Sequence, residues 1–186
     1  MNIAVYCGAS SGKNYIYTEK AVELSKWIAS NNNTLVYGGG NVGLMGLIAD
    51  TVLENGGSAI GVIPTFLVDK EIAHQGLTEL HTVETMHERK AKMISLSDCF
   101  IALPGGPGTL EEITEVISWG RIGQHVNPCI LFNTNGYYDL LKSQYELMVD
   151  EGFLSKEDRD KILFTDSFNE IEVFIRGYKA PKIRTY

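Results

Sequence analysis

The sequence predicts one α/β domain with a Rossmann-like, doubly wound and mostly parallel sheet that carries helices on both faces. Short apolar runs alternate along the chain with longer segments of helical period, which is the order β-α-β-α. The run at residues 99–104, CFIALP, is apolar almost throughout, as expected of a strand buried on both faces. The 186 residues contain no repeat or linker, so we expect a single domain over residues 1–186.

In the first half of the chain, each expected strand is a short apolar run and each helix has an apolar stripe at a spacing of three to four residues. Proline ends the third strand, and a looser connection follows it at residues 65–76. In chain order we expect strand 3–7, helix 17–30, strand 34–38, helix 44–55, strand 58–64 and strand 79–83.

The second half repeats this alternation, and its helices are longer and more polar than its strands. The expected order is helix 86–97, strand 99–104, helix 109–120, strand 128–133, helix 137–152, strand 162–165 and a last helix from about residue 167. In such sheets ligands bind beyond the carboxyl ends of the strands, where the strand order reverses. Turns that directly follow a strand are therefore the places to look for a site.

The composition excludes several classes of partner. The formal charge of −7 gives the surface no general attraction for nucleic acid or anionic membranes, so an anionic ligand must be held locally. The three cysteines and four histidines follow no metal-ligand spacing, and we expect no metal site and free, buried thiols. Without a long apolar run or a basic, apolar leader, the chain is expected to be cytoplasmic.

Two glycine-containing turns superficially match nucleotide-binding motifs. The segment CGASSGKN has three residues between Gly8 and Gly12 and has Asn14 where a P-loop requires a hydroxyl, so we reject an ATPase. The segment GGGNVG satisfies GxGxxG from Gly38 to Gly43, but the next strand ends without the carboxylate that holds the ribose of NAD. An NAD site is therefore not favoured, and this backbone is expected to pass close to either a ligand or a packed helix.

A third turn, LPGGPGTLEE at residues 103–112, combines three glycines with a helix expected to begin at or near Thr109. The unpaired N–H groups and the dipole of a helix N-terminus attract phosphate. Thr109 and Glu112 also match a capping box, which stabilises helices without any ligand. The capping motif alone favours that structural role. A capping box does not require three glycines before it, however, so we expect a phosphate there.

Upstream, the segment MHERK places Arg89 and Lys90 in the first turn of a helix that follows a strand. Cations at this end oppose the helix dipole by about 0.3–1 kcal/mol. A solvated helix face accounts for Lys90 but less well for Arg89. In a parallel sheet both residues would lie near the PGGPGT turn.

Five motifs are spread over nearly the whole chain. In chain order they are YCGAS, GGGNVGLMG, MHERK, PGGPGTLEE and NGYYDLL. In this order they resemble the cytokinin-activating phosphoribohydrolases, the "Lonely Guy" family, whose members have often been labelled lysine decarboxylases. The resemblance implies hydrolysis of the N-glycosidic bond of a nucleoside 5′-monophosphate, either AMP or an N6-substituted AMP such as a cytokinin riboside monophosphate. The products are the free base and ribose 5-phosphate, and no metal or cofactor is required.

The resemblance also implies roles for individual residues. Arg89 and Glu112 match the catalytic pair. The substrate contacts that it implies are Glu71, Arg89, Lys90, Gly106, Pro107, Gly108, Thr109, Leu110, Glu111 and Ser118. Many relatives carry threonine where Ser118 stands.

The chemistry agrees with these roles, because cleavage builds positive charge on the ribose and a carboxylate stabilises that charge. Glu112 could bind ribose hydroxyls, assist a water or attack directly, and the sequence leaves all three open.

Two other functions compete with this one. A non-catalytic carrier of nucleotides or of molybdenum cofactor would use the same glycine turns, although a carboxylate beside the expected ribose favours the enzyme. A pyridoxal phosphate decarboxylase would need a Schiff-base lysine, for which Lys90 and Lys92 are candidates only by residue type. The family also implies a homodimer, for which the apolar segment at residues 115–123 supplies either interface or core.

Overall fold

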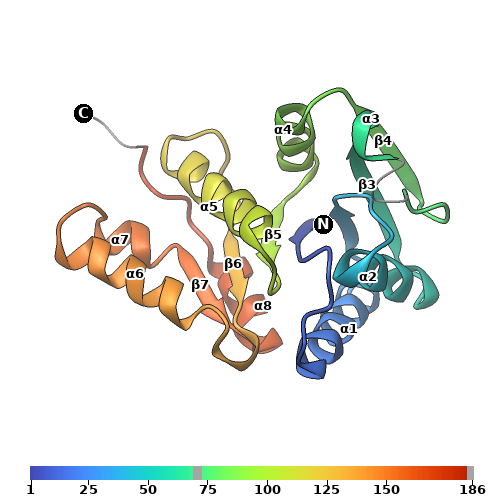
Figure 1. The fold of residues 1–186 in the computed structure, drawn as a ribbon. Coiled ribbons are helices and arrows are strands. Elements are labelled where there is room, and N and C mark those ends of the chain that lie inside the picture. Colours follow the sequence, from blue (N-terminus) through green and yellow to red (C-terminus); the bar gives the residue numbers. More distant parts are fainter. Residues whose placement is uncertain (69–72, 184–186) are drawn as a thin grey trace.

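The structure is a computed structural model that describes residues 1–68 and 73–183. Its centre is a seven-stranded sheet in the order β4-β3-β2-β1-β5-β6-β7 (Figure 1). All six strand pairs are parallel, so the sheet is wholly rather than mostly parallel over the described residues. The strands are β1 (Asn2–Tyr6), β2 (Thr34–Tyr37), β3 (Ser58–Pro64), β4 (Glu79–Val83), β5 (Cys99–Ala102), β6 (Cys129–Phe132) and β7 (Ile162–Thr165).

The strand order reverses beside β1. From β1 the chain winds outward through β2 and β3 to β4, and then returns to place β5 against the other side of β1. The carboxyl ends of β1 and β5 therefore flank the switch point, where the connections depart in opposite directions and leave a crevice.

Helices cover both faces of the sheet (Figure 1). One face packs against α1 (Tyr15–Ser30), α2 (Gly43–Glu54) and α8 (Phe168–Gly177), and the other against α4 (Met86–Leu96), α5 (Pro107–Arg121) and α6 (Asp139–Asp150). Side chains of β1 alternate between the two cores: Ile3 and Val5 point to the first, Ala4 and Tyr6 to the second. None of the helices in the described ranges is long and apolar enough to cross a membrane.

Some boundaries differ from those that the sequence predicts. The connection expected to be loose begins with a short helix, α3 (Thr65–Val68), and a second short helix, α7 (Lys156–Arg159), precedes β7. A 3₁₀ turn, η1 (Thr134–Gly136), lies before α6, which starts two residues later than expected. Each of these pieces is only three or four residues long, too short to show a helical period in the sequence.

The start of α5 is the difference that matters for the site. The helix begins at Pro107, two residues before Thr109, with Gly106 as its N-cap, and the N-cap has no side-chain hydrogen bond. Proline suits the first helical position because its φ is already helical and its missing N–H would have no partner there. Thr109 is therefore the third residue of the helix, and the predicted Thr109–Glu112 capping box is wrong.

Candidate active site

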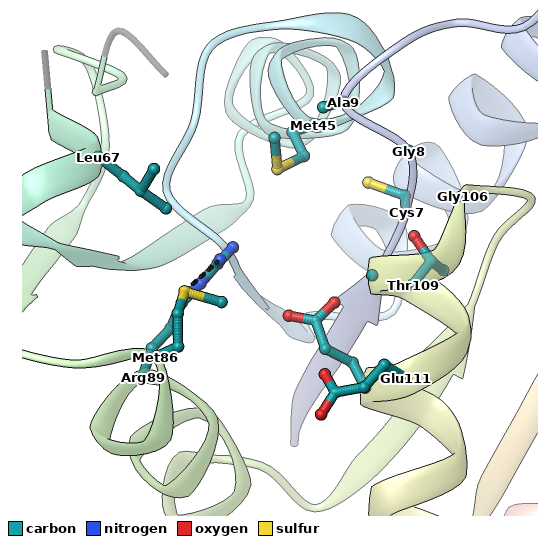
Figure 2. A pocket seen from close by; sticks show the side chains of 12 residues that line it. Cys7, Gly8, Ala9, Met45, Leu67, Met86, Arg89, Gly106, Thr109 and Glu111 are labelled. Carbon is teal, nitrogen blue, oxygen red and sulfur yellow. Dashed lines mark hydrogen bonds between the residues drawn. The ribbon is translucent and has the colours of Figure 1, made fainter. Parts of the chain in front are cut away.

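A cavity of about 310 Å³ opens at the switch point, beyond the carboxyl ends of β1 and β5 (Figure 2). Arg89 and Met86 reach it from α4, while Gly106, Thr109 and Glu111 lie on the opposite side. The lining residues come from five segments that are distant in the sequence: Cys7, Gly8, Ala9, Met45, Leu67, Met86, Arg89, Gly106, Gly108, Thr109, Glu111 and Glu112.

The N-terminus of α5 forms one wall of this cavity. The first N–H groups of a helix have no partner within the helix, and the positive end of its dipole lies there. A Cβ atom at Gly106 or Gly108 would have no described heavy atom within 4 Å, so the backbone faces open space. Thr109 is only 4% exposed and lines the same wall. An anionic group can therefore approach this backbone closely.

Arg89 lies opposite this wall and is only 6% exposed. Its Nη2 donates to the carbonyl oxygen of Gly38 at 3.3 Å, and its Nη1 lies 3.7 Å from the sulfur of Met86. Its Nε is buried and has no hydrogen-bond acceptor among the described residues. A buried donor without an acceptor is costly, which favours a ligand that supplies one.

Glu112 reaches the cavity from the second turn of α5. Burial raises the pKa of the Cys7 thiol above its usual range, the Glu112 carboxylate raises it further, and Arg89 lowers it. Burial likewise raises the pKa of Tyr6, with the same opposing contributions from Glu112 and Arg89. Cys7, Arg89 and Glu112 all line the same cavity.

Lys90 links the two helices beside the cavity. Its Nζ donates to Glu111 at 2.5 Å and to Glu115 at 3.0 Å, which joins α4 to α5. Burial lowers the pKa of Lys90, but the hydrogen bonds to Glu111 and Glu115 and the charges of these two carboxylates together outweigh the burial and leave the pKa raised. Lys90 is therefore held as a cation against carboxylates.

The remaining wall is apolar. Met45 from α2, Leu67 from α3 and Met86 from α4 line it, away from the N-terminus of α5 (Figure 2). Thioether and aliphatic side chains adapt to flat, apolar surfaces. The cavity thus has a helix N-terminus suited to an anion on one side and, beside Arg89 on the other, apolar side chains suited to a ring.

The structure brings most of the predicted site residues together. Arg89, Gly106, Gly108, Thr109, Glu111 and Glu112 all line the cavity. In the described structure Lys90, Pro107, Leu110 and Ser118 do not line it; Lys90 contacts it only through Glu111. Ser118 is exposed and nine residues beyond Thr109, about 13 Å along the helix axis. Glu71 lies outside the described residues.

Sequence reasoning missed half of the lining. Cys7, Gly8 and Ala9 follow β1 in a segment that was rejected as a P-loop and matched to the family as YCGAS, but was given no role in the site. Their place after the strand at the switch point was the available signal. Met45 and Met86 stand inside motifs that were recognised, GGGNVGLMG and MHERK, yet a methionine on a helix more often indicates core. Only the tertiary structure shows which methionines face a cavity.

The pyridoxal phosphate decarboxylase finds less support in these residues. No lysine lines the cavity in the part of the chain that the structure describes, so its wall offers no Schiff-base lysine for pyridoxal phosphate. The same part of the chain contains no group of three or more potential metal ligands of the His, Cys, Asp and Glu types. In the segment at residues 115–123, Val116 and Ile117 are buried in the core on the face of α4 and α5.

Relatives and solved structures extend these observations. A family model described as "Possible lysine decarboxylase" matches residues 45–173. Among solved structures, the molybdenum cofactor carrier protein of Chlamydomonas reinhardtii superposes with a TM-score of 0.68 at 19% identity, over 94% of this chain and 97% of that one. The molybdenum cofactor binding protein of Rippkaea orientalis gives 0.67 at 24%, over 92% and 93%. At these identities the likeness is one of fold.

Curated relatives are much closer in sequence. A cytokinin riboside 5′-monophosphate phosphoribohydrolase of Arabidopsis thaliana is 44% identical over 177 residues, which is 95% of this chain and 78% of that protein. One from Rhodococcoides fascians is 44% identical over 181 residues, 97% of this chain and 90% of that protein. The chain therefore belongs to the cytokinin riboside 5′-monophosphate phosphoribohydrolase family of enzymes.

Proposed function

We propose that the protein hydrolyses the N-glycosidic bond of a nucleoside 5′-monophosphate, either AMP or an N6-substituted AMP such as a cytokinin riboside monophosphate. The observation that carries this proposal is the cavity itself. A helix N-terminus, a buried guanidinium and the carboxylate of Glu112 face one another at the switch point. The names of the relatives supply the substrate class.

The two ends of the cavity support an orientation for the nucleotide. The phosphate would lie on the backbone of Gly106, Gly108 and Thr109, where N–H groups and the helix dipole favour an anion. The base would lie on the apolar wall of Met45, Leu67 and Met86. This orientation leaves the ribose between the two ends.

Glu112 is then the group nearest the bond that breaks. It lies three residues beyond Thr109, about 4.5 Å farther along the helix axis, which is close to the length of a ribose. A carboxylate there stabilises the positive charge that develops on the ribose as the base departs. Arg89, which lies opposite, would supply a donor for the substrate.

The first test is release of adenine from AMP and of the substituted base from N6-isopentenyl AMP, followed by chromatography. Glu112→Gln keeps the size of the side chain and removes its charge, so we expect turnover to fall at least about a hundredfold. Glu54→Gln, an exposed carboxylate at the far end of α2, is the matched control and should behave as wild type.

Each outcome of this test is informative. Tight binding of both nucleotides without base release would indicate the non-catalytic carrier instead. Equal turnover by wild type and Glu112→Gln would remove Glu112 from the mechanism. A preference for one nucleotide would decide between AMP and the N6-substituted substrate.

The remaining contacts expected from the family stay predictions. They are Glu71, Lys90, Pro107, Leu110, Glu111 and Ser118. A homodimer, which the family implies, and a cytoplasmic location, which was expected from the sequence, are likewise proposals. Light scattering on the purified protein tests the first, since a dimer has twice the mass of one chain.

A further inference from the structure

Three consecutive carbonyl groups of the glycine turn each accept a hydrogen bond from a different donor. The hydroxyl of Tyr138 donates to Leu103 at 2.7 Å, and the N–H of Gly8 donates to Pro104 at 3.3 Å. The hydroxyl of Tyr137 donates to Gly105 at 2.6 Å. The turn is thus fixed from outside, through its carbonyl oxygens, just before the N-terminus of α5.

The two tyrosines are presented by the turn between β6 and α6. The side-chain carbonyl of Asn133 accepts from the N–H of Tyr138 at 2.6 Å, and its amide group donates to Asp139 at 2.7 Å. The ring of Tyr137 packs edge-on against Tyr17, with centroids 5.6 Å apart, and against Tyr138, 5.1 Å apart. This packing limits the positions that the Tyr137 hydroxyl can take.

The bond to Gly105 controls the direction of the next N–H group. In a trans peptide the carbonyl and the N–H point in opposite directions, so a Gly105 carbonyl that faces Tyr137 turns the Gly106 N–H away from Tyr137. Gly106 lies between the active-site cavity and a second cavity of about 230 Å³ that Tyr17 and Tyr137 line. Gly106 and Gly105 have no side chains that would otherwise hold this peptide.

We propose that Tyr137 is a positioning residue that orients the Gly105–Gly106 peptide so that the turn binds the 5′-phosphate of the substrate. The inference rests on the proposed function, which assigns the phosphate to this turn. Tyr138 has a different role, because it is only 4% exposed and belongs to the core, whereas Tyr137 is 43% exposed. Loss of the Tyr137 hydroxyl therefore acts on the turn more than on the stability of the fold.

Tyr137→Phe tests this, because it removes the hydroxyl and keeps the ring against Tyr17. Calorimetry would measure Kd for ribose 5-phosphate, which carries the phosphate, and for adenosine, which lacks it. We expect Kd for ribose 5-phosphate to rise about tenfold, the effect of one lost hydrogen bond, with Kd for adenosine and the Tm unchanged. In steady-state kinetics KM should rise more than kcat falls.

Tyr17→Phe is the matched control, since it removes a hydroxyl from the same second cavity but not the bond to Gly105, and it should bind as wild type does. If Tyr137→Phe leaves Kd for ribose 5-phosphate unchanged while the wild-type protein turns over its substrate, the role of Tyr137 is overturned and the proposed function is not. An equal loss of affinity for adenosine would also overturn that role, because the effect would then not be specific to phosphate. A wild-type protein that releases base but does not bind ribose 5-phosphate would instead remove the phosphate assignment itself.

Discussion

The molecule contains two glycine-rich turns of similar composition, GGGNVG after β2 and GGPG after β5, and their surroundings are opposite. In the first, a Cβ atom at Gly43 would lie 2.3 Å from the carbonyl carbon of Ala9, and one at Gly38 would lie 1.8 Å from Nη2 of Arg89. In the second, a Cβ atom at Gly105 would lie 2.2 Å from Oγ1 of Thr109, but one at Gly106 or Gly108 would meet no described atom within 4 Å.

The first turn is enclosed by protein on several sides. The N–H of His74 donates to the carbonyl of Gly39 at 3.0 Å, and the N–H of Leu44 donates to that of Gly8 at 3.2 Å. Its glycines therefore allow one part of the backbone to approach another, whereas Gly106 and Gly108 leave room for a molecule that is not protein. The same residue type serves packing in the first turn and at Gly105, and access at Gly106 and Gly108.

The largest effect is expected at Gly43, whose φ of +58° adds a backbone penalty to the contact with Ala9. We expect Gly43→Ala to lose about 4 kcal/mol or more of unfolding free energy, which few domains tolerate. Urea denaturation measures it. Gly56→Ala is the control, because Gly56 has a similar φ of +76° but open space around its Cβ position, so it should lose only about 1–2 kcal/mol. Equal losses in the two variants would contradict the role of the Ala9 contact.

A smaller effect is expected at Gly38, which belongs to the first turn yet contacts the site through Arg89. Because the clashing atom is the end of a side chain, Gly38→Ala should fold but displace the guanidinium. We expect kcat/KM to fall about a hundredfold, as for removal of a charge-stabilising group. The double variant with Arg89→Ala should be no worse than Arg89→Ala alone. Additive losses would show that Gly38 acts by another route.

The smallest effect is expected at Gly108, in the second turn. Gly108→Ala adds a methyl group to open space in the first turn of α5, so the Tm should stay the same or rise slightly. If the phosphate lies on this backbone, the methyl group should raise KM about tenfold, the loss of about 1.4 kcal/mol of binding. Thermal denaturation and steady-state kinetics test both parts. An unchanged KM would place the phosphate elsewhere.

Much of the fold could be predicted from periodicity alone. The bounds of β3 and β4 agree with the apolar runs at residues 58–64 and 79–83, and the helices on both faces follow from their apolar stripes. Within the candidate site, the glycine turn and the Arg89 segment were recognisable because both directly follow strands of a parallel sheet. Residues 69–72, which include Glu71, are not described, so that contact stays a prediction.

The start of α5 could not be predicted, because Thr109 and Glu112 satisfy a local capping pattern and Pro107 satisfies another. The choice between them depends on which residue best begins the helix once the turn is held by Gly8 and the two tyrosines. With this start, Glu112 lies in the second turn of α5 and lines the cavity wall. The capping pattern and the proline pattern each predict a helix start, and contacts between residues distant in the sequence decide between the two.

By itself, the sequence determined the alternation of strands and helices, the parallel sheet and the two glycine-rich turns, because these depend on periodicity and on neighbours along the chain. Only the tertiary structure decided which turn is packed and which is open, and which methionines line a cavity. It also decided that Arg89 and Glu112 line one cavity at the switch point. Those properties depend on which atoms are neighbours in space, and such neighbours can be far apart in the sequence.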